Sequence, residues 1–156
     1  DCMEFEDSRR EMGELEVGFT CGAFDLCHAG HLMMFEECKD RCDYLIVGLA
    51  ANTFDRPGKN EPIETLFERY MRLRACKWID EIIVYDNEED LGTILQFLSN
   101  KYQNKFTRFL DETYEKPGFN FSNLLIKIHF NIRRHNFSST NLRKRIIAQN
   151  LKKPKR

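Results

Sequence analysis

Two strand-like segments, separated by one helical stretch, limit most strongly what this chain can fold into. Residues 17–21 and 43–49 read as strands, and the second has the continuous apolar character of a strand buried on both faces of a parallel sheet. The apolar positions between them recur at the spacing of one helix face: Leu32, Phe35, Cys38 and Cys42. Strand, helix and strand within about thirty residues predict a right-handed βαβ unit.

The same alternation continues along the chain. Helical and strand-like patterns follow one another over residues 63–78, 81–85, 91–102, 106–110 and 124–130. A final helix is expected to begin near Ser139 or Thr140, whose hydroxyls suit an N-cap, and to continue through Leu142, Ile146 and Ile147. The alternation predicts an α/β fold, a Rossmann-like open parallel sheet of five strands with helices on both faces. Ligands of such sheets bind beyond the carboxyl ends of the strands.

Length and charge indicate one domain with charged ends. A chain of 156 residues suits a single core. We expect the domain to span residues 17–150, between an acidic extension over 1–16 and a basic tail over 151–156. Residues 1–16 carry seven acids against two arginines, a net charge of -5, whereas residues 142–156 carry seven basic residues and no acid. Such a basic end is more often a solvated helix terminus than a nucleic-acid arm, so no nucleic-acid partner is expected.

Composition favours a cytoplasmic protein with reduced cysteines. No apolar run approaches the roughly 18 residues that cross a bilayer, and the acidic amino end lacks the apolar stretch of a signal peptide. The six cysteines are therefore expected to be free thiols. Cys38 and Cys42 lie four apart without a partner pair at zinc-site spacing, so no structural zinc is expected.

The loop over residues 22–31, GAFDLCHAGH, carries the strongest chemical signal. His28 and His31 are three residues apart at a helix start and should face the same side, beside free backbone N–H groups and the positive end of the helix dipole. Gly22 permits a sharp exit from the strand, and Gly30 lets a phosphate approach the backbone. A phosphate site is favoured over a metal site, which needs three or four ligands, and over two unrelated surface histidines.

These residues resemble a known family. GxFDxxHxGH after a first strand is similar to the nucleotidyltransferase superfamily motif, and leucine rather than proline at position 26 resembles its cytidylyltransferase branch. Glu68-Arg69 and residues 77–82, KWIDEI, resemble two further family segments, ER and RYVDEV. Residues 133–142, RRHNFSSTNL, resemble the RTxGISTT segment that closes over the triphosphate. Across about residues 17–147 the chain is similar to the glycerol-3-phosphate cytidylyltransferases.

The resemblance implies transfer of CMP from CTP to a phosphorylated small alcohol such as glycerol 3-phosphate, with release of pyrophosphate. His28 and His31 would donate to the reacting phosphate, and Lys59 and Arg133 would bind phosphate, which makes these four the candidate catalytic residues. The residues expected to bind the nucleotide are Gly22, Ala23, Phe24, Asp25, Gly30, Glu112, Tyr114, Ser138, Ser139 and Thr140. Magnesium is expected with the triphosphate, held by few or no protein ligands.

The resemblance also leaves alternatives open. Lys77 and Trp78 are candidates for the acceptor pocket, although a lone tryptophan at an apolar helix end is more simply a core residue. Arg69 resembles an arginine associated with the family's active site and dimer interface, so a homodimer is expected. Residues 111–114, DETY, depart from the family's GDDW or GEDY. The resemblance therefore supports recognition of the base by this segment less than it supports the phosphate contacts. An adenylyltransferase and a catalytically silent nucleotide-binding protein are the rival interpretations.

Overall fold

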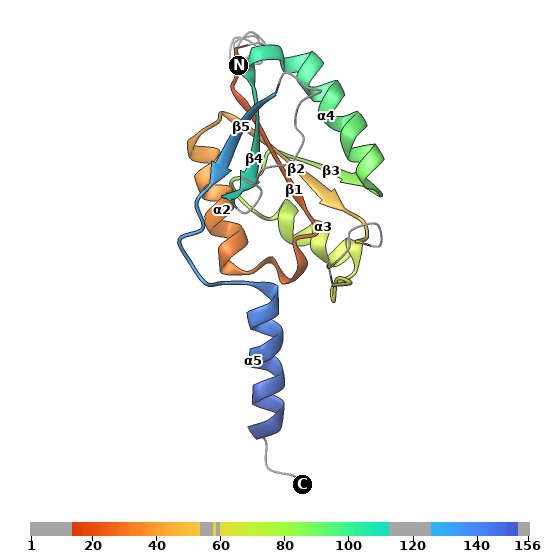
Figure 1. Ribbon diagram of the computed structural model, residues 1–156, viewed down its shortest axis with the longest axis vertical. Coiled ribbons are helices and arrows are strands. Elements are labelled where there is room, and N and C mark those ends of the chain that lie inside the picture. The colour runs from red at the N-terminus through yellow and green to blue at the C-terminus, as the bar shows by residue number, and fades with distance from the viewer. Residues whose placement is uncertain (1–13, 54–57, 59, 113–125, 153–156) are drawn as a thin grey trace, which may run out of the picture.

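A computed structural model of the chain describes residues 14–53, 58, 60–112 and 126–152. Its centre is a sheet of five parallel strands in the order β3-β2-β1-β4-β5. The strands are β1 (Val17–Gly22), β2 (Tyr44–Ala50), β3 (Glu81–Tyr85), β4 (Phe106–Asp111) and β5 (Lys127–Asn131). The chain runs outward from β1 to β3 and then returns to the other side of β1, so the strand order reverses between β1 and β4. The predicted Rossmann-like α/β fold is confirmed (Figure 1).

Helices cover both faces of this sheet. The helices are α2 (Ala29–Asp40), α3 (Leu66–Arg74), α4 (Glu88–Tyr102) and α5 (Ser139–Lys152), with short 3-10 turns η1 (Asp25–Cys27) and η2 (Gln103–Lys105). Phe35 of α2 and Leu73 of α3 pack in one core with Leu45 and Phe109 of the sheet. The opposite core joins α4 to the other side of the strands, through Leu91, Leu95, Leu98, Phe19 and Phe106. Buried apolar area on both sides of β1 and β2 holds these layers together.

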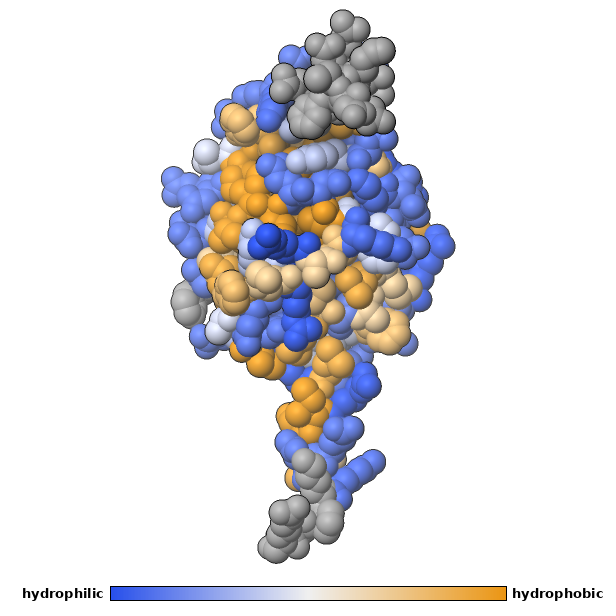
Figure 2. Space-filling view, turned by 180° about the vertical axis from the view of Figure 1, so that it is seen from behind, coloured by the Kyte–Doolittle hydropathy of each residue, from blue (hydrophilic) through white to orange (hydrophobic). Residues whose placement is uncertain are grey.

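Helix α5 belongs to neither layer. It extends away from the carboxyl end of the sheet, and none of its residues is buried (Figure 1). Ile146, Ile147 and Leu151 of α5 are exposed apolar side chains. Figure 2 shows apolar area on the projecting helix. Among the described residues, Ser139 and Arg143 near its start join α5 to the body, through contacts described below with the site.

Local capping explains where the element bounds differ from those predicted. The helix predicted over 63–78 begins at Leu66, because Thr65 and Glu68 form a reciprocal capping box, and it ends at Arg74. Helix α4 begins earlier than residue 91, because the Asn87 side chain accepts from the Asp90 N–H and acts as N-cap. The last helix begins at Ser139, as predicted. Residue 124, the predicted start of the fifth strand, lies outside the described residues.

Helix α2 also differs from its predicted apolar face. Phe35 and Cys38 are fully buried, but Leu32 is 36% exposed, and Cys42 follows the helix instead of lying within it. The five cysteines that the structure describes are free thiols. In the same described residues, no helix combines the length and the apolar character that a membrane crossing needs. The predicted end segments are described only over residues 14–16 and 151–152.

Arg69 of α3 is a fully buried cation that ties the ends of two strands to this helix. Its guanidinium donates to the carbonyls of Ala50 (2.6 Å), Ala51 (2.8 Å) and Ala23 (3.1 Å), and its Nε donates to the carbonyl of Glu64 (3.2 Å). These carbonyls lie at or just beyond the ends of β1 and β2, or just before α3, where the sheet ladder no longer supplies donors. Arg69 does not line the cavity described next, so the structure gives it a supporting position in the fold.

Candidate active site

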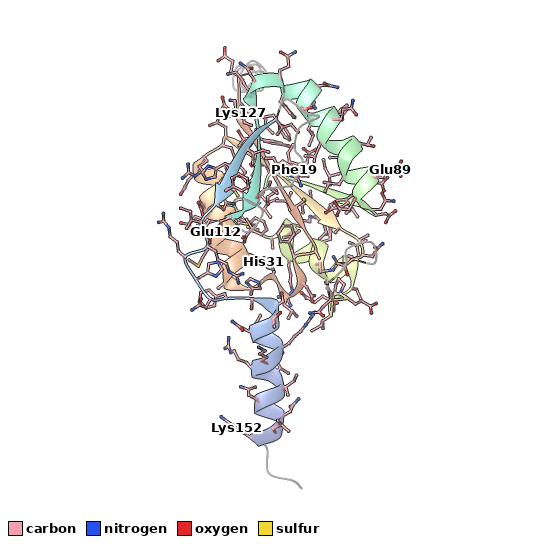
Figure 3. All side chains as sticks on the ribbon, in the orientation of Figure 1. Phe19, His31, Glu89, Glu112, Lys127 and Lys152 are labelled. Atoms are coloured by element: carbon pink, nitrogen blue, oxygen red, sulfur yellow. The ribbon has the colours of Figure 1, made fainter. Side chains whose placement is uncertain are left out.

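A cavity of about 520 Å³ opens where the strand order reverses. The last residues of three strands line it, Gly22 of β1, Asp111 of β4 and Asn131 of β5. The remaining walls come from the loop after β1, helix α2, the segment between β2 and α3, the segment between β5 and α5, and the start of α5. In Figure 3, His31 lies at the end of the sheet from which α5 projects, whereas Lys127 lies at the opposite end. The cavity therefore occupies the position expected for a ligand of this fold.

The loop after β1 has an unusual backbone. Phe24, Leu26 and Cys27 all have positive φ angles, of 49°, 62° and 29°, although none is glycine. Each such residue costs of the order of 1 kcal/mol or more, and clusters of them occur at functional sites. They let the chain turn sharply from β1 into α2 and bring both histidines to the cavity.

Asp25 holds this strained loop in place. Its carboxylate accepts from the N–H groups of Ile63 (2.8 Å) and Glu64 (3.0 Å), and it forms an ion pair with Arg143 of α5 (3.0 Å). The Asp25 carbonyl also accepts from the Ser139 hydroxyl (3.3 Å). The carboxylate is 8% exposed, so these partners replace the water it has lost. Asp25 thereby joins the loop, the segment before α3 and the start of α5.

His28 and His31 form a stacked pair at the start of α2. Their ring centroids are 3.7 Å apart with an angle of 21° between planes, and both rings line the cavity. His28 is the N-cap of the helix, and its Nδ1 accepts from the His31 N–H (3.3 Å). An Nδ1 that accepts a hydrogen bond leaves the proton of the neutral ring on Nε2. The pair can therefore offer N–H donors at the positive end of the α2 dipole.

Burial keeps both imidazoles neutral. It lowers the pKa of His31 to about 3, with a further contribution from His28, while Asp25 acts in the opposite direction. Burial also lowers the pKa of His28, and the nearby Arg133 and His135 add to this effect. Neutral rings can donate to a phosphate without a prior protonation step, which suits stabilisation of developing charge at neutral pH.

This electrostatic arrangement predicts a pH-dependent stability. The unfolded chain binds a proton at His31 near pH 6.5, but the folded chain does so only near pH 3. Below pH 6.5 the unfolded chain takes up a proton at His31 that the folded chain does not. The free energy of unfolding is therefore unaffected by His31 above pH 6.5, and it falls as the pH drops from 6.5 toward 3. We expect the free energy of unfolding in urea to fall between pH 8 and pH 5, with His31 contributing about 1–2 kcal/mol of the decrease. The His31→Gln variant should show a shallower pH dependence, and equal slopes for the two proteins would contradict the assignment.

Gly30 makes room for two histidine rings. A Cβ at this position would lie 2.9 Å from Cε1 of His28 and still closer to Cε1 of His135. The sequence predicted that Gly30 lets a phosphate approach the backbone, and the structure adds this second reason for the absence of a side chain. The close packing places His28 and His135 against the same point of α2.

The variant Gly30→Ala is expected to lower the activity of this site by about 10-fold or more, because both rings must move from their positions and geometry near the reacting groups is costly to disturb. Turnover and the unfolding midpoint would be measured together. Gly92→Ala is the matched control: a Cβ there meets nothing within 4 Å, and alanine favours the helix. Equal turnover in Gly30→Ala and Gly92→Ala would contradict the packing argument.

The segment before α5 brings further predicted residues to the cavity. Arg133, Ser138, Ser139 and Thr140 all line it. The Arg133 guanidinium donates to the Phe137 carbonyl, and the Arg133 N–H donates to the Glu112 carboxylate (3.3 Å). Ser138 accepts from the Asn141 N–H (3.0 Å) and so caps the helix. Glu112 itself is exposed and supports Arg133 from outside the set of lining residues.

Other predicted site residues fall into three groups. Those that line the cavity beside the histidines are Gly22, Ala23, Phe24, Asp25 and Gly30. Lys59 and Tyr114 lie outside the described residues. The structure does not bring Lys77 and Trp78 to this cavity, because they precede β3 and therefore lie near the amino edge of the sheet. Trp78 packs against the core beneath α2 and α3, and Lys77 lies over its ring (4.9 Å).

Sequence reasoning missed Arg143 and His135 as residues of the site. Both line the cavity, and Arg143 donates to the Asp25 carboxylate and to the Glu61 carbonyl (3.2 Å). In the sequence Arg143 was one member of a basic terminal segment, and His135 fell at a variable position of the family segment. Neither position carried a local signal.

The fold and the cavity define a nucleotidyltransferase-type site, with paired imidazoles at a helix start beyond the strand ends. The sequence model named cytidylyltransferase-like matches residues 19–145, and the chain belongs to this family. The bifunctional protein HldE of Rhodospirillum rubrum is 33% identical over 100 residues, which cover 63% of this chain and 20% of that protein. The ethanolamine-phosphate cytidylyltransferase of Dictyostelium discoideum is 30% identical over 84 residues, covering 53% of this chain and 23% of that protein.

The chain thus spans about a fifth of the length of these curated relatives. A solved structure, the lipopolysaccharide core biosynthesis protein from Thermoplasma volcanium, aligns with a TM-score of 0.55 at 21% identity, covering 80% of this chain and 99% of that one. At this identity the similarity shows the shared fold.

Proposed function

We propose that this protein transfers CMP from CTP to a phosphorylated small alcohol, such as glycerol 3-phosphate or ethanolamine phosphate, and releases pyrophosphate. The observation that carries the proposal is the stacked His28–His31 pair, which opens into a 520 Å³ cavity beside Arg133. Family membership supports nucleotidyl transfer, and the relative named ethanolamine-phosphate cytidylyltransferase supports a phospho-alcohol acceptor.

The reaction is a displacement at the α-phosphorus of the triphosphate. A phosphate oxygen of the acceptor forms the new P–O bond, and the bond from the α-phosphorus to the oxygen bridging to the β-phosphate breaks, which releases pyrophosphate. A phosphomonoester with a second pKa of about 6 is already largely dianionic at neutral pH, so the attack needs no strong base. This agrees with neutral histidines that serve as donors. His28 and His31 would stabilise charge on the transferring phosphate, and Arg133 would hold the triphosphate.

We propose that Mg²⁺ enters with the triphosphate and retains several waters. The Asp25 carboxylate belongs to the histidine loop, and it is already bound by two N–H groups and Arg143. In the described part of the chain, no group of three or more His, Cys, Asp or Glu side chains is arranged to hold an ion. When bound to the nucleotide, Mg²⁺ would offset part of the triphosphate charge, while the imidazoles act on the transferring group.

The choice of CTP over ATP rests on Leu26 and on the segment from Arg133 to Thr140, which resemble the cytidylyltransferase branch. Asp111, at the position of a glycine in the family segment that it resembles, lines the cavity. An adenylyltransferase with the same site chemistry is the second candidate. We further propose that the protein is cytoplasmic and forms a homodimer. Light scattering of the purified protein would check the homodimer.

The function is tested by measuring pyrophosphate release with CTP, ATP, GTP and UTP, each with and without glycerol 3-phosphate, ethanolamine phosphate and choline phosphate. Acceptor-dependent release with CTP supports the proposal. Release with ATP alone assigns the protein to adenylyl transfer instead. No release in any combination, with a folded protein, would indicate a catalytically silent nucleotide-binding protein.

A further inference from the structure

A third histidine, His135, reaches the same cavity from the segment between β5 and α5. Its Cε1 is the atom closest to a Cβ built on Gly30, and Cε1 of His28 is the next closest. The two rings therefore contact the same residue of the first turn of α2. Three of the chain's four histidines thus gather at this helix start, although 104 residues of sequence separate His31 from His135.

Two contacts hold the His135 ring in one orientation. Its Nδ1 accepts from the Phe137 N–H (3.1 Å), and its ring stacks with the Phe137 ring at 5.5 Å between centroids. Since Nδ1 is an acceptor, the neutral ring carries its proton on Nε2. In the described residues nothing accepts from this Nε2–H. His28 has the same arrangement, because its own Nδ1 accepts from the His31 N–H.

The surroundings of these rings favour an anion over a cation. Arg133 lies close enough to help lower the pKa of His28, and the first residues of α2, at the positive end of its dipole, line the same cavity. The stacked geometry of His28 and His31 keeps their ring planes nearly parallel, instead of directing lone pairs at one shared point. No cluster suited to a metal ion is found here among the described residues.

We propose that His135 is a third phosphate-binding imidazole of this site, which donates from Nε2 to the pyrophosphate portion of the nucleoside triphosphate. This inference rests on the proposed nucleotidyl transfer. Its particular content is that the segment before α5 supplies an imidazole as well as Arg133. His28 and His31 at the start of α2 then act on the transferring phosphate, while His135 donates to the departing pyrophosphate. Release of pyrophosphate breaks the contact with the segment before α5.

The test compares the wild-type protein with His135→Ala, His135→Gln and His129→Ala. Glutamine can place an amide N–H near the position of Nε2, so it separates loss of a donor from loss of the ring. His129 lies on β5, contacts Phe109 and does not line the cavity, which makes it the matched histidine control. Binding of sodium pyrophosphate and of CTP would be measured by calorimetry, and kcat/KM by pyrophosphate release.

We expect His135→Ala to weaken pyrophosphate binding about 10-fold and to lower kcat/KM about 10- to 100-fold. His135→Gln should recover part of both losses, and His129→Ala should match the wild type. Wild-type pyrophosphate binding by a folded His135→Ala protein would overturn the inference, as would equal losses in the alanine and glutamine variants. If the wild type transfers no nucleotide, the proposed function fails, but a selective loss of pyrophosphate binding in His135→Ala would still identify the phosphate contact.

Discussion

Replacement of His31 by alanine is expected to lower kcat by about 10²–10³-fold or more while leaving the fold intact. His31 lies in the cavity wall, and its neutral ring is stacked on His28 and packed edge-on against Phe24 (5.3 Å). Removal of a donor that acts on charge developing in the transition state lowers kcat strongly and weakens substrate binding much less. The predicted result is therefore a large fall in kcat with a small change in KM for CTP.

Single-turnover measurements of pyrophosphate release would check this, because they separate the chemical step from product release. Circular dichroism and the unfolding midpoint would show that the variant is folded. His129→Ala again provides the comparison, since it removes a histidine of the same fold that lies away from the cavity. Turnover within a few-fold of the wild type in folded His31→Ala would remove the role assigned to this ring.

Replacement of Arg69 by methionine is expected to lower the free energy of unfolding by about 3–5 kcal/mol. Methionine fills much of the same space but leaves four carbonyls, of Ala23, Ala50, Ala51 and Glu64, without their buried donor. A loss of this size is a large part of the stability of a domain this long. The effect would be measured by urea unfolding, at a pH above 7 where His31 is neutral in both states.

Arg74→Met is the control for this variant. Arg74 ends the same helix α3 but is exposed, so its replacement should change the unfolding free energy by less than about 0.5 kcal/mol. If Arg69→Met proved as stable as Arg74→Met, the four hydrogen bonds would not contribute what their burial implies.

Local sequence patterns predicted the fold well. Continuous apolar runs predicted where the strands lie, and their alternation with helices predicted a parallel sheet. Both signals depend on residues that are neighbours in the sequence. The histidine motif was predicted at the correct edge of the sheet for the same reason, since a ligand site follows from strand direction. Ser139 was also correctly expected near the start of the last helix.

Interactions between distant segments could not be read from the sequence. Asp25 was expected among the nucleotide-binding residues, but its pairing with Arg143 spans 118 residues and has no local pattern. The four carbonyls bound by Arg69 likewise come from three separate segments. Trp78 was a candidate for the acceptor pocket because of its type, whereas its place before β3 puts it near the opposite edge. Burial at that edge depends on packing that a single sequence does not display.

The ion pair between Asp25 and Arg143 has a consequence for the order in which the proposed active site forms. All five strands are complete once Asn131 has been synthesised, yet the loop that presents His28 and His31 is then still missing its contacts with Ser139 and Arg143. During translation the sheet can form before the histidine loop is secured. Competence for catalysis would then arrive as a late event, timed by the emergence of α5 from the ribosome.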